Sequence, residues 1–255
     1  MIMKKIFTFL ILTSLFAGYS FAKDFDFTPI NIDFKGVEAK GDTIIAFGSH
    51  GSAMISYDDA ENWEQVQIFE NGIITQIFFL ETSIAALNLN GQIHASVDGG
   101  ISWNYVSTLE DSILYSISAN NKIFIRTKNR LLKMNSRYEI ENEAQIETPF
   151  WWGFQKRQSS WDKESMIFFK DHLYCIRDTS LIIKYNEKLI PVDSLIFNSS
   201  GTGKYESIYR IFCDNSSIFV SGYDKAPIIY KLNDNNNLIK YLKLYYNEEI
   251  FKNDS

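Results

Sequence analysis

One pattern recurs five times along the chain: two short apolar runs separated by a polar turn. Successive copies are 40, 39, 50 and 45 residues apart, measured between Ile44, Ile84, Ile123, Leu173 and Ile218. Apolar and β-branched runs joined by a turn rich in Gly, Asn or charged residues are typical of a β-hairpin. Self-similarity at a period of roughly 20–50 residues predicts a repeat architecture with one structural unit per copy.

Further apolar runs flank these hairpins. A third run precedes four of them, at residues 73–80, 113–118, 166–169 and 208–212, and a fourth follows at 63–69, 103–107 and 238–244. Four strands in about 40–45 residues is the size of one propeller blade. We therefore predict an all-β chain with a single β-propeller domain of four-stranded blades over residues 23–255. Five blades are favoured, and a sixth built from residues 24–35 and 245–255 is the alternative.

The N-terminus predicts export. Lys4 and Lys5 precede an apolar run over residues 6–16, and small residues end at Ala22. This order is that of a secretory signal peptide, here residues 1–22, and its apolar part is shorter than the ~20 residues that span a bilayer. We expect cleavage near Ala22 and a periplasmic or extracellular protein that is not inserted in the membrane.

Charge and composition exclude some functions. The chain carries 25 basic and 31 acidic residues, a net charge of −6, and loss of Lys4 and Lys5 makes it more negative. A nucleic-acid partner is not expected, because such proteins need a basic face. The sequence also predicts no cofactor and no metal site, since three scattered histidines lack ligand spacing. Cys175 and Cys213 each lie in a strand-like run, which favours two separate buried thiols, with a disulfide as the alternative.

The strongest local motif follows the second hairpin. Residues 96–103 read Ser-Val-Asp-Gly-Gly-Ile-Ser-Trp, which matches the pattern Ser-x-Asp-x-Gly-x-Ser/Thr-Trp called an Asp-box. We expect Asp98 to accept hydrogen bonds from backbone amides of a tight turn in which Ser96 is a further structural residue, and Gly100 to take a backbone conformation that other residues reach only at a cost. Trp103 should pack as an apolar plug between strands.

A degraded copy lies 40 residues earlier. It keeps Ser56, Asp58 and Trp63, but Ala60 replaces the glycine and Asn62 replaces the hydroxyl residue. Ala60 predicts a different or strained turn. Asn62 predicts the loss of one hydrogen bond of the turn. Both Asp-boxes are expected to be structural.

On these motifs the chain resembles the Asp-box (BNR-repeat) β-propellers. That family includes sialidases, sortilin-type receptor propellers, xyloglucan-degrading enzymes and photosystem II assembly factor-like propellers. The motif covers two copies, whereas the corresponding turns of later copies begin at Asn135, Asn186 and Asn233 and contain neither Trp nor Ser-x-Asp.

The resemblance does not carry an enzymatic site with it. Sialidases of this class hold the substrate carboxylate with three arginines, the first in an Arg-Ile-Pro motif near the N-terminus. Here no arginine precedes Arg126, and the nearest match, Arg210-Ile211-Phe212, lacks the proline. Sialidase motifs are thus not found, and no catalytic residue is predicted.

An aromatic segment suggests binding. Residues 150–161 contain three of the five tryptophans and coincide with the longest spacing between repeats. The candidate binding residues are Trp151, Trp152, Arg157 and Trp161, because such side chains make sugar-stacking or protein-binding patches. Packing within a blade is the alternative. The main functional hypothesis is a non-catalytic protein-interaction or assembly scaffold, with a carbohydrate-binding propeller and an Asp-box glycoside hydrolase as alternatives.

Overall fold

The computed structural model describes residues 32–146, 165–178, 181–196, 207–223, 227–232 and 238–243. Within these ranges lie twenty β-strands and one short 3-10 helix, Ser49–Gly51. The strands form five antiparallel sheets of four strands each, which confirms the predicted all-β class and the four-stranded repeat. The predicted signal peptide, residues 1–22, lies outside the described residues.

Neighbours in sequence are neighbours within every sheet. The first sheet contains β1 (Phe34–Lys40), β2 (Thr43–Gly48), β3 (Ser52–Ser56) and β4 (Glu64–Gln67). The second contains β5 (Ile74–Phe79), β6 (Ile84–Asn88), β7 (Gln92–Ser96) and β8 (Asn104–Thr108). The third contains β9 (Ile113–Ala119), β10 (Lys122–Thr127), β11 (Arg130–Met134) and β12 (Ile140–Gln145). The fourth contains β13 (Met166–Phe169), β14 (His172–Asp178), β15 (Leu181–Tyr185) and β16 (Pro191–Ile196). The fifth contains β17 (Ser207–Cys213), β18 (Ile218–Tyr223), β19 (Pro227–Leu232) and β20 (Leu238–Lys243).

The two middle strands of each sheet are the hairpins that the repeat predicts. In β3 and β6 every residue is buried. Apart from Ser52, Ser56 and Asn88, the residues of these two strands are apolar, as expected of strands that are buried along their whole length. The outer strands β4, β8 and β12 are mostly exposed and correspondingly polar.

The chain divides into two compact units, Met1–Ile77 and Phe78–Ser255. In the first unit Trp63 packs on a small cluster of Ile32, Ala46 and Met54. The prediction of one domain over residues 23–255 stays a prediction.

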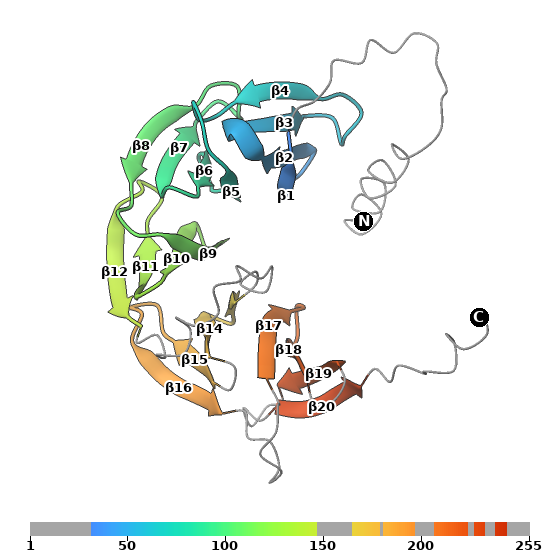
Figure 1. Cartoon of the computed structure of the whole chain (residues 1–255), viewed down its shortest axis with the longest axis vertical. Coiled ribbons are helices and arrows are strands. Elements are labelled where there is room, and N and C mark those ends of the chain that lie inside the picture. The colour runs from blue at the N-terminus through green and yellow to red at the C-terminus, as the bar shows by residue number, and fades with distance from the viewer. Residues whose placement is uncertain are drawn as a thin grey trace, which may run out of the picture. The chain divides into compact units, whose positions relative to one another are not determined.

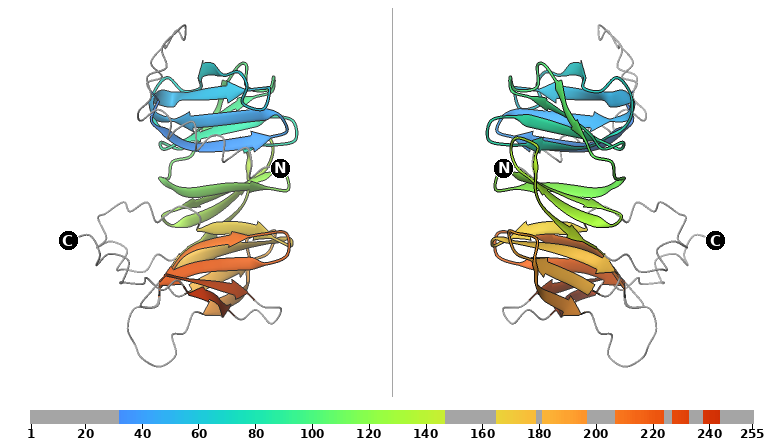
Figure 2. Two further views of the ribbon diagram at one scale, coloured as in Figure 1. Left: turned by 90° about the vertical axis from the view of Figure 1, so that its right-hand side faces the viewer. Right: turned by 90° about the vertical axis from the view of Figure 1, so that its left-hand side faces the viewer.

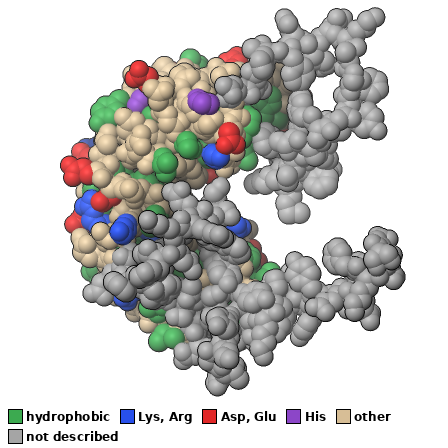
Figure 3. All heavy atoms as spheres, in the orientation of Figure 1, with side chains coloured by type: hydrophobic (Ala, Val, Ile, Leu, Met, Phe, Trp, Pro, Cys, Tyr) green, Lys and Arg blue, Asp and Glu red, His purple; other side chains and the backbone are tan. Residues whose placement is uncertain are grey.

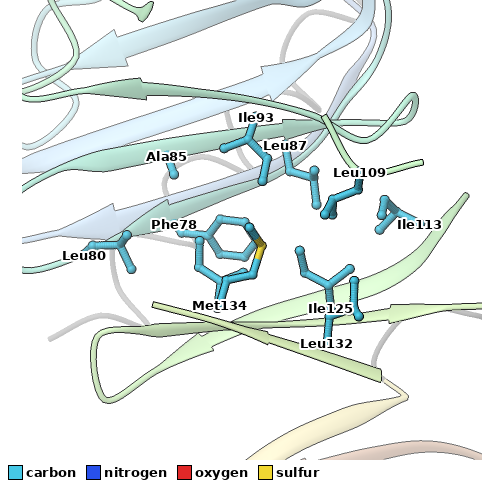
Figure 4. Close-up of a cluster of buried hydrophobic side chains, with 11 residues drawn as sticks. Phe78, Leu80, Ala85, Leu87, Ile93, Leu109, Ile113, Ile125, Leu132 and Met134 are labelled. Atoms are coloured by element: carbon cyan, nitrogen blue, oxygen red, sulfur yellow. The ribbon is translucent and has the colours of Figure 1, made fainter. Parts of the chain in front are cut away.

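In the second unit the core lies between consecutive sheets, which face one another (Figure 2). Figure 4 shows the cluster in which Leu87 and Ile93 of the second sheet meet Ile125 and Leu132 of the third. Similar clusters join the third sheet to the fourth and the fourth to the fifth. The outer strands β8, β12 and β16 lie on the side opposite β9 and β17 (Figure 1), and the inner strand β13 contacts both β9 and β17.

The two thiols are free in the structure. Cys175 is buried in β14 as predicted, but Cys213 at the end of β17 is exposed, so the prediction that both are buried is wrong for Cys213. Cys213 is exposed because β17 ends there and the chain enters a turn. Burial raises the pKa of the Cys175 thiol.

We expect one thiol of the folded chain to react readily with Ellman's reagent at pH 8 and the second to react only on unfolding. Because the thiolate is the attacking species and Cys175 is both buried and poorly ionised, its reaction should be at least ~100-fold slower. Counting released chromophore in native buffer and in guanidinium checks this. A Cys213→Ser control should show no fast thiol, and a native chain with no reactive thiol at all would instead indicate a disulfide.

Candidate functional site

The Asp-box of the second sheet forms a closed hydrogen-bonded turn between β7 and β8. The Ser96 hydroxyl donates to Asp98 Oδ1 at 2.7 Å and accepts from the Gly100 amide at 2.7 Å. The Ser102 amide and hydroxyl donate to the two Asp98 oxygens at 2.9 Å and 2.5 Å, and Trp103 Nε1 donates to the Gly100 carbonyl at 2.9 Å. Donation by Ser102, and then by Ser96, holds the pKa of Asp98 well below its usual range. Both oxygens of the Asp98 carboxylate therefore accept hydrogen bonds within its own turn, which supports a structural role.

The Asp-box of the first sheet keeps the same hydrogen-bond pattern with different groups. Asn62 donates its side-chain amide to Asp58 Oδ2 at 2.6 Å. The predicted loss of a hydrogen bond is therefore wrong, because an amide can donate where a hydroxyl otherwise would. Ala60 has φ +74° and Asp59 has φ +62°, conformations that are strained for residues with a side chain. Ser56 still accepts from the Ala60 amide at 2.9 Å.

In the third and fourth sheets an asparagine turn occupies the place of the Asp-box. Asn135 Oδ1 accepts from the backbone amides of residues 137 and 139, and Asn186 Oδ1 accepts from those of residues 188 and 190. Tyr138 and Leu189 sit in these turns with φ +66° and +57°. Each packs on an inter-sheet cluster. In the first sheet Trp63 packs instead on Ile32, Ala46 and Met54. The sequence signal was the asparagine itself, which favours such turns.

A charged network covers the third sheet. Lys122 Nζ lies 2.6 Å from Glu141 Oε1, Lys133 Nζ lies 3.6 Å from Glu141 Oε2, and Arg130 Nη1 lies 3.0 Å from Glu143 Oε2. Basic and acidic side chains accordingly lie next to one another on the surface of the molecule (Figure 3). Charges on an outer strand discourage pairing with another chain, and these opposite charges offset one another.

Arg126 is buried between the third and fourth sheets. It is 2% exposed, and its Nη1 donates to the Ile176 carbonyl in β14. Burial raises the pKa of Tyr185 to about 12, against the opposing charge of Arg126. Arg126 thus joins two sheets and does not offer its charge to a ligand in solution.

One carboxyl of the first unit is partly desolvated. Glu38 in β1 accepts a hydrogen bond from Gln76 Nε2 at 2.5 Å, and burial raises its pKa although this bond acts in the opposite direction. A glycosidase needs two carboxyl groups, and here the partner that Glu38 contacts is an amide.

We expect Glu38→Gln to raise the thermal midpoint at pH 7 and to leave it almost unchanged near pH 3.5. Because the folded-state pKa is raised, the protonated form is favoured in the fold, and this stabilisation is present below the unfolded-state pKa and lost as pH rises through the folded one. Scanning calorimetry at both pH values checks the difference. Glu64→Gln, in an exposed position of β4, is the control, and equal shifts for Glu38→Gln at the two pH values would contradict the expectation.

The fifth sheet presents a partly exposed face with aromatic and basic side chains, which we call the β17–β19 face. Along the three strands the side chains of this face alternate with the buried residues Ile211, Val220 and Tyr230, which point toward the fourth sheet. Strand register aligns them in two rows, Phe212–Phe219–Lys231 and Arg210–Ser221–Ile229.

In the first row, neighbouring side chains contact one another through their aromatic rings. Phe212 and Phe219 stack with centroids 5.5 Å apart, and Lys231 Nζ lies 5.9 Å from the Phe219 centroid. Phe212 is 38% exposed and Arg210 is exposed. Two aromatic rings between two cations form a surface suited to protein contact, since aromatic residues and arginine supply much of the energy of protein interfaces. None of these residues was predicted from the sequence to bind a partner.

The candidate binding residues Trp151, Trp152, Arg157 and Trp161 lie outside the described residues. Within the described ranges, no three His, Cys, Asp or Glu side chains gather closely enough to hold a metal ion. The same ranges contain no helix that is both long and apolar enough to cross a bilayer.

Comparison with known proteins identifies the fold. No family model and no curated protein matches the sequence. Among solved structures, YCF48 bound to D1 peptide matches with a TM-score of 0.62 at 12% identity, covering 86% of this chain and 71% of that one. YCF48 from Cyanidioschyzon merolae matches with 0.59 at 13%, covering 83% and 72%, and BamB from Moraxella catarrhalis with 0.58 at 12%, covering 80% and 62%. At these identities the likeness shows the fold alone: the chain is a β-propeller protein of four-stranded sheets.

Proposed function

We propose that this chain is a non-catalytic, exported β-propeller that binds another protein and serves as an interaction or assembly scaffold. The observation that carries the proposal is the partly exposed β17–β19 face, where the stacked rings of Phe212 and Phe219 lie beside Arg210 and Lys231. A similar propeller, YCF48, has a solved structure with D1 peptide bound, which supports a peptide or protein as the ligand class.

The described ionisable groups support binding more than catalysis. Asp58 and Asp98 hold turns, Glu141 and Glu143 lie in ion pairs, and Arg126 is buried between sheets. A general acid or nucleophile must instead face the substrate.

To test binding, the mature chain, residues 23–255, is immobilised and then incubated with an envelope extract of its native host. We expect saturable capture of an identified protein at a fixed stoichiometry, and at least ~10-fold weaker binding by Phe212→Ser, since central aromatic residues of an interface contribute about 2 kcal/mol or more. Val192→Ser, a comparably exposed apolar position on β16 (51% exposed), is the control. Hydrolysis of model glycosides, or Phe212→Ser binding as tightly as Val192→Ser, would count against the proposal.

Export belongs to the same proposal. Lys4, Lys5 and the apolar run at residues 6–16 support a cleaved signal peptide. N-terminal sequencing of the protein from its native host should begin at Lys23. Recovery of the chain from the cytoplasm with Met1 intact would oppose this.

A further inference from the structure

We propose that Asn71 is a modification site, at which the side chain reacts with the backbone nitrogen of Gly72, loses ammonia and leaves aspartate or isoaspartate in the main chain. Asn71 and Gly72 lie between β4 and β5, in the unit Met1–Ile77. The chain contains a second Asn-Gly pair, Asn90–Gly91, in the turn between β6 and β7. The fold leaves the first pair available for this reaction and restrains the second. The reaction does not depend on the proposed binding function.

The reaction needs an accessible backbone nitrogen and a side chain that can turn toward it. The Gly72 nitrogen attacks the side-chain carbonyl carbon of Asn71, a C–N bond forms, and the side-chain amide leaves as ammonia together with the proton of the Gly72 amide. Water then opens the cyclic succinimide. Attack at the side-chain carbonyl gives aspartate, and attack at the main-chain carbonyl gives isoaspartate, whose main chain runs through the former side chain. A glycine favours ring closure because it has no Cβ beside its nitrogen.

Asn71 and Gly72 meet both requirements. Asn71 is exposed, and among the described residues neither its side chain nor the Gly72 amide forms a hydrogen bond. Gly72 is held through its carbonyl, which accepts the Gly51 amide at 2.7 Å. The nitrogen that must attack is therefore accessible while the fold around it stays intact.

The Asn90–Gly91 pair shows the opposite arrangement. The Gly91 amide donates to the Asn88 carbonyl at 3.0 Å, and the Asn90 amide donates to Asn88 Oδ1 at 3.0 Å. The Gly91 carbonyl accepts the Leu109 amide at 2.9 Å, so the glycine is fixed on both sides. Ring closure at Asn90 must break the hydrogen bond of the attacking nitrogen and open the turn, which makes it slower than at Asn71.

Isoaspartate at position 71 also disturbs the fold around Gly51. It adds a methylene to the main chain immediately before Gly72, whose carbonyl holds the Gly51 amide. The Gly51 carbonyl in turn accepts the amides of Ile68 at 2.8 Å and Phe69 at 3.0 Å, and both of these side chains are buried. A main-chain shift at Gly72 therefore reaches buried residues of the first unit, and we expect the isoaspartate form to be less stable than the parent.

The test follows each asparagine while the mature chain is incubated at pH 8. Samples are digested at low pH, and mass spectrometry with chromatographic separation of the isoaspartate peptides measures the converted fraction. We expect Asn71 to convert at least ~10-fold faster than Asn90, because the open state that Asn90 needs is rarely populated. Incubation in guanidinium is the control: unfolding removes the hydrogen bonds of both turns, and the two Asn-Gly pairs should then convert at rates within ~3-fold of each other.

Equal rates at Asn71 and Asn90 in the folded chain would overturn the inference, and so would an Asn71 that reacts only in guanidinium. A ~10-fold difference that persists in guanidinium would show that the local sequence, not the fold, separates the two pairs. The thermal midpoint of the parent should fall as isoaspartate accumulates, whereas Asn71→Gln, with a longer side chain that closes the ring less readily, should keep its midpoint. Freshly purified Asn71→Asp adds the charge without the methylene, and a midpoint as low as that of the isoaspartate form would contradict the proposed effect on the Gly51 contact.

Discussion

A Gly91→Ala variant is expected to lose about 2–5 kcal/mol of folding free energy, a larger loss than that of Gly99→Ala. The two glycines share the left-handed backbone, with φ +80° and +81°. A Cβ on Gly91 would lie 2.4 Å from the Leu109 carbonyl oxygen, whereas a Cβ on Gly99 meets nothing within 4 Å. The difference between the variants therefore isolates the clash from the backbone strain, which alone should amount to about 1–2 kcal/mol.

The clash cannot relax cheaply because Gly91 makes a backbone contact that recurs in the first sheet at Gly51. Its carbonyl accepts the Leu109 amide at 2.9 Å, just as the Gly51 carbonyl accepts the Phe69 amide at 3.0 Å forty residues earlier. Moving the Leu109 backbone away would break that bond and disturb Leu109, which is buried in the inter-sheet core. Guanidinium unfolding of both variants and the parent measures the effect. Equal losses for Gly91→Ala and Gly99→Ala would contradict it.

The hairpins were predictable because their information is local. Runs such as those of β2 and β6 are mostly apolar and end in turn residues, so composition alone identifies them. The outer strands β12 and β16 were not predicted. They are exposed on most of their length and contain Glu, Asn, Ser and Asp, since an outer strand has little to bury and its polar residues imitate a loop.

Predicting the β17–β19 face required the register of three strands. Simple alternation would place Ile208, Arg210 and Phe212 on one side of β17. A bulge between Ile208 and Arg210 changes this: it sends Ile208 into the core with Val220 and leaves the other two exposed. A bulge shifts the side of every later residue, and nothing in the sequence around Tyr209 announces it. The Asp-box turns, by contrast, need only contiguous residues.

A motif that predicts a turn does not by itself predict what the protein does. The Asp-box predicted that Asp98 accepts hydrogen bonds within its turn, and the structure shows donation to it by the Ser102 amide. The hydrogen bond from the Ser96 hydroxyl to Asp98 was not predicted. The Asp-box motif did not reveal that Asn135 and Asn186 build equivalent turns, because the two kinds of turn are similar in geometry but differ in residue types. Neither the Asp-box turn nor the asparagine turn indicates a function, because both serve to form turns of the fold.

The inter-sheet core of the second unit should unfold as one body. Leu87→Ala and Ile125→Ala, both at fully buried positions of neighbouring sheets, are each expected to lose about 2–5 kcal/mol, because each deletes packed atoms and leaves a cavity. Leu89→Ala makes the same change two residues away at a side chain that is 46% exposed, and we expect less than about 1 kcal/mol there. Because Leu87 and Ile125 belong to one cluster (Figure 4), Ile125→Ala should also raise hydrogen exchange of β6 amides by as much as that of β10 amides. Faster exchange confined to β10 would show that each sheet opens separately, and a loss for Leu87→Ala no larger than for Leu89→Ala would place Leu87 outside the core.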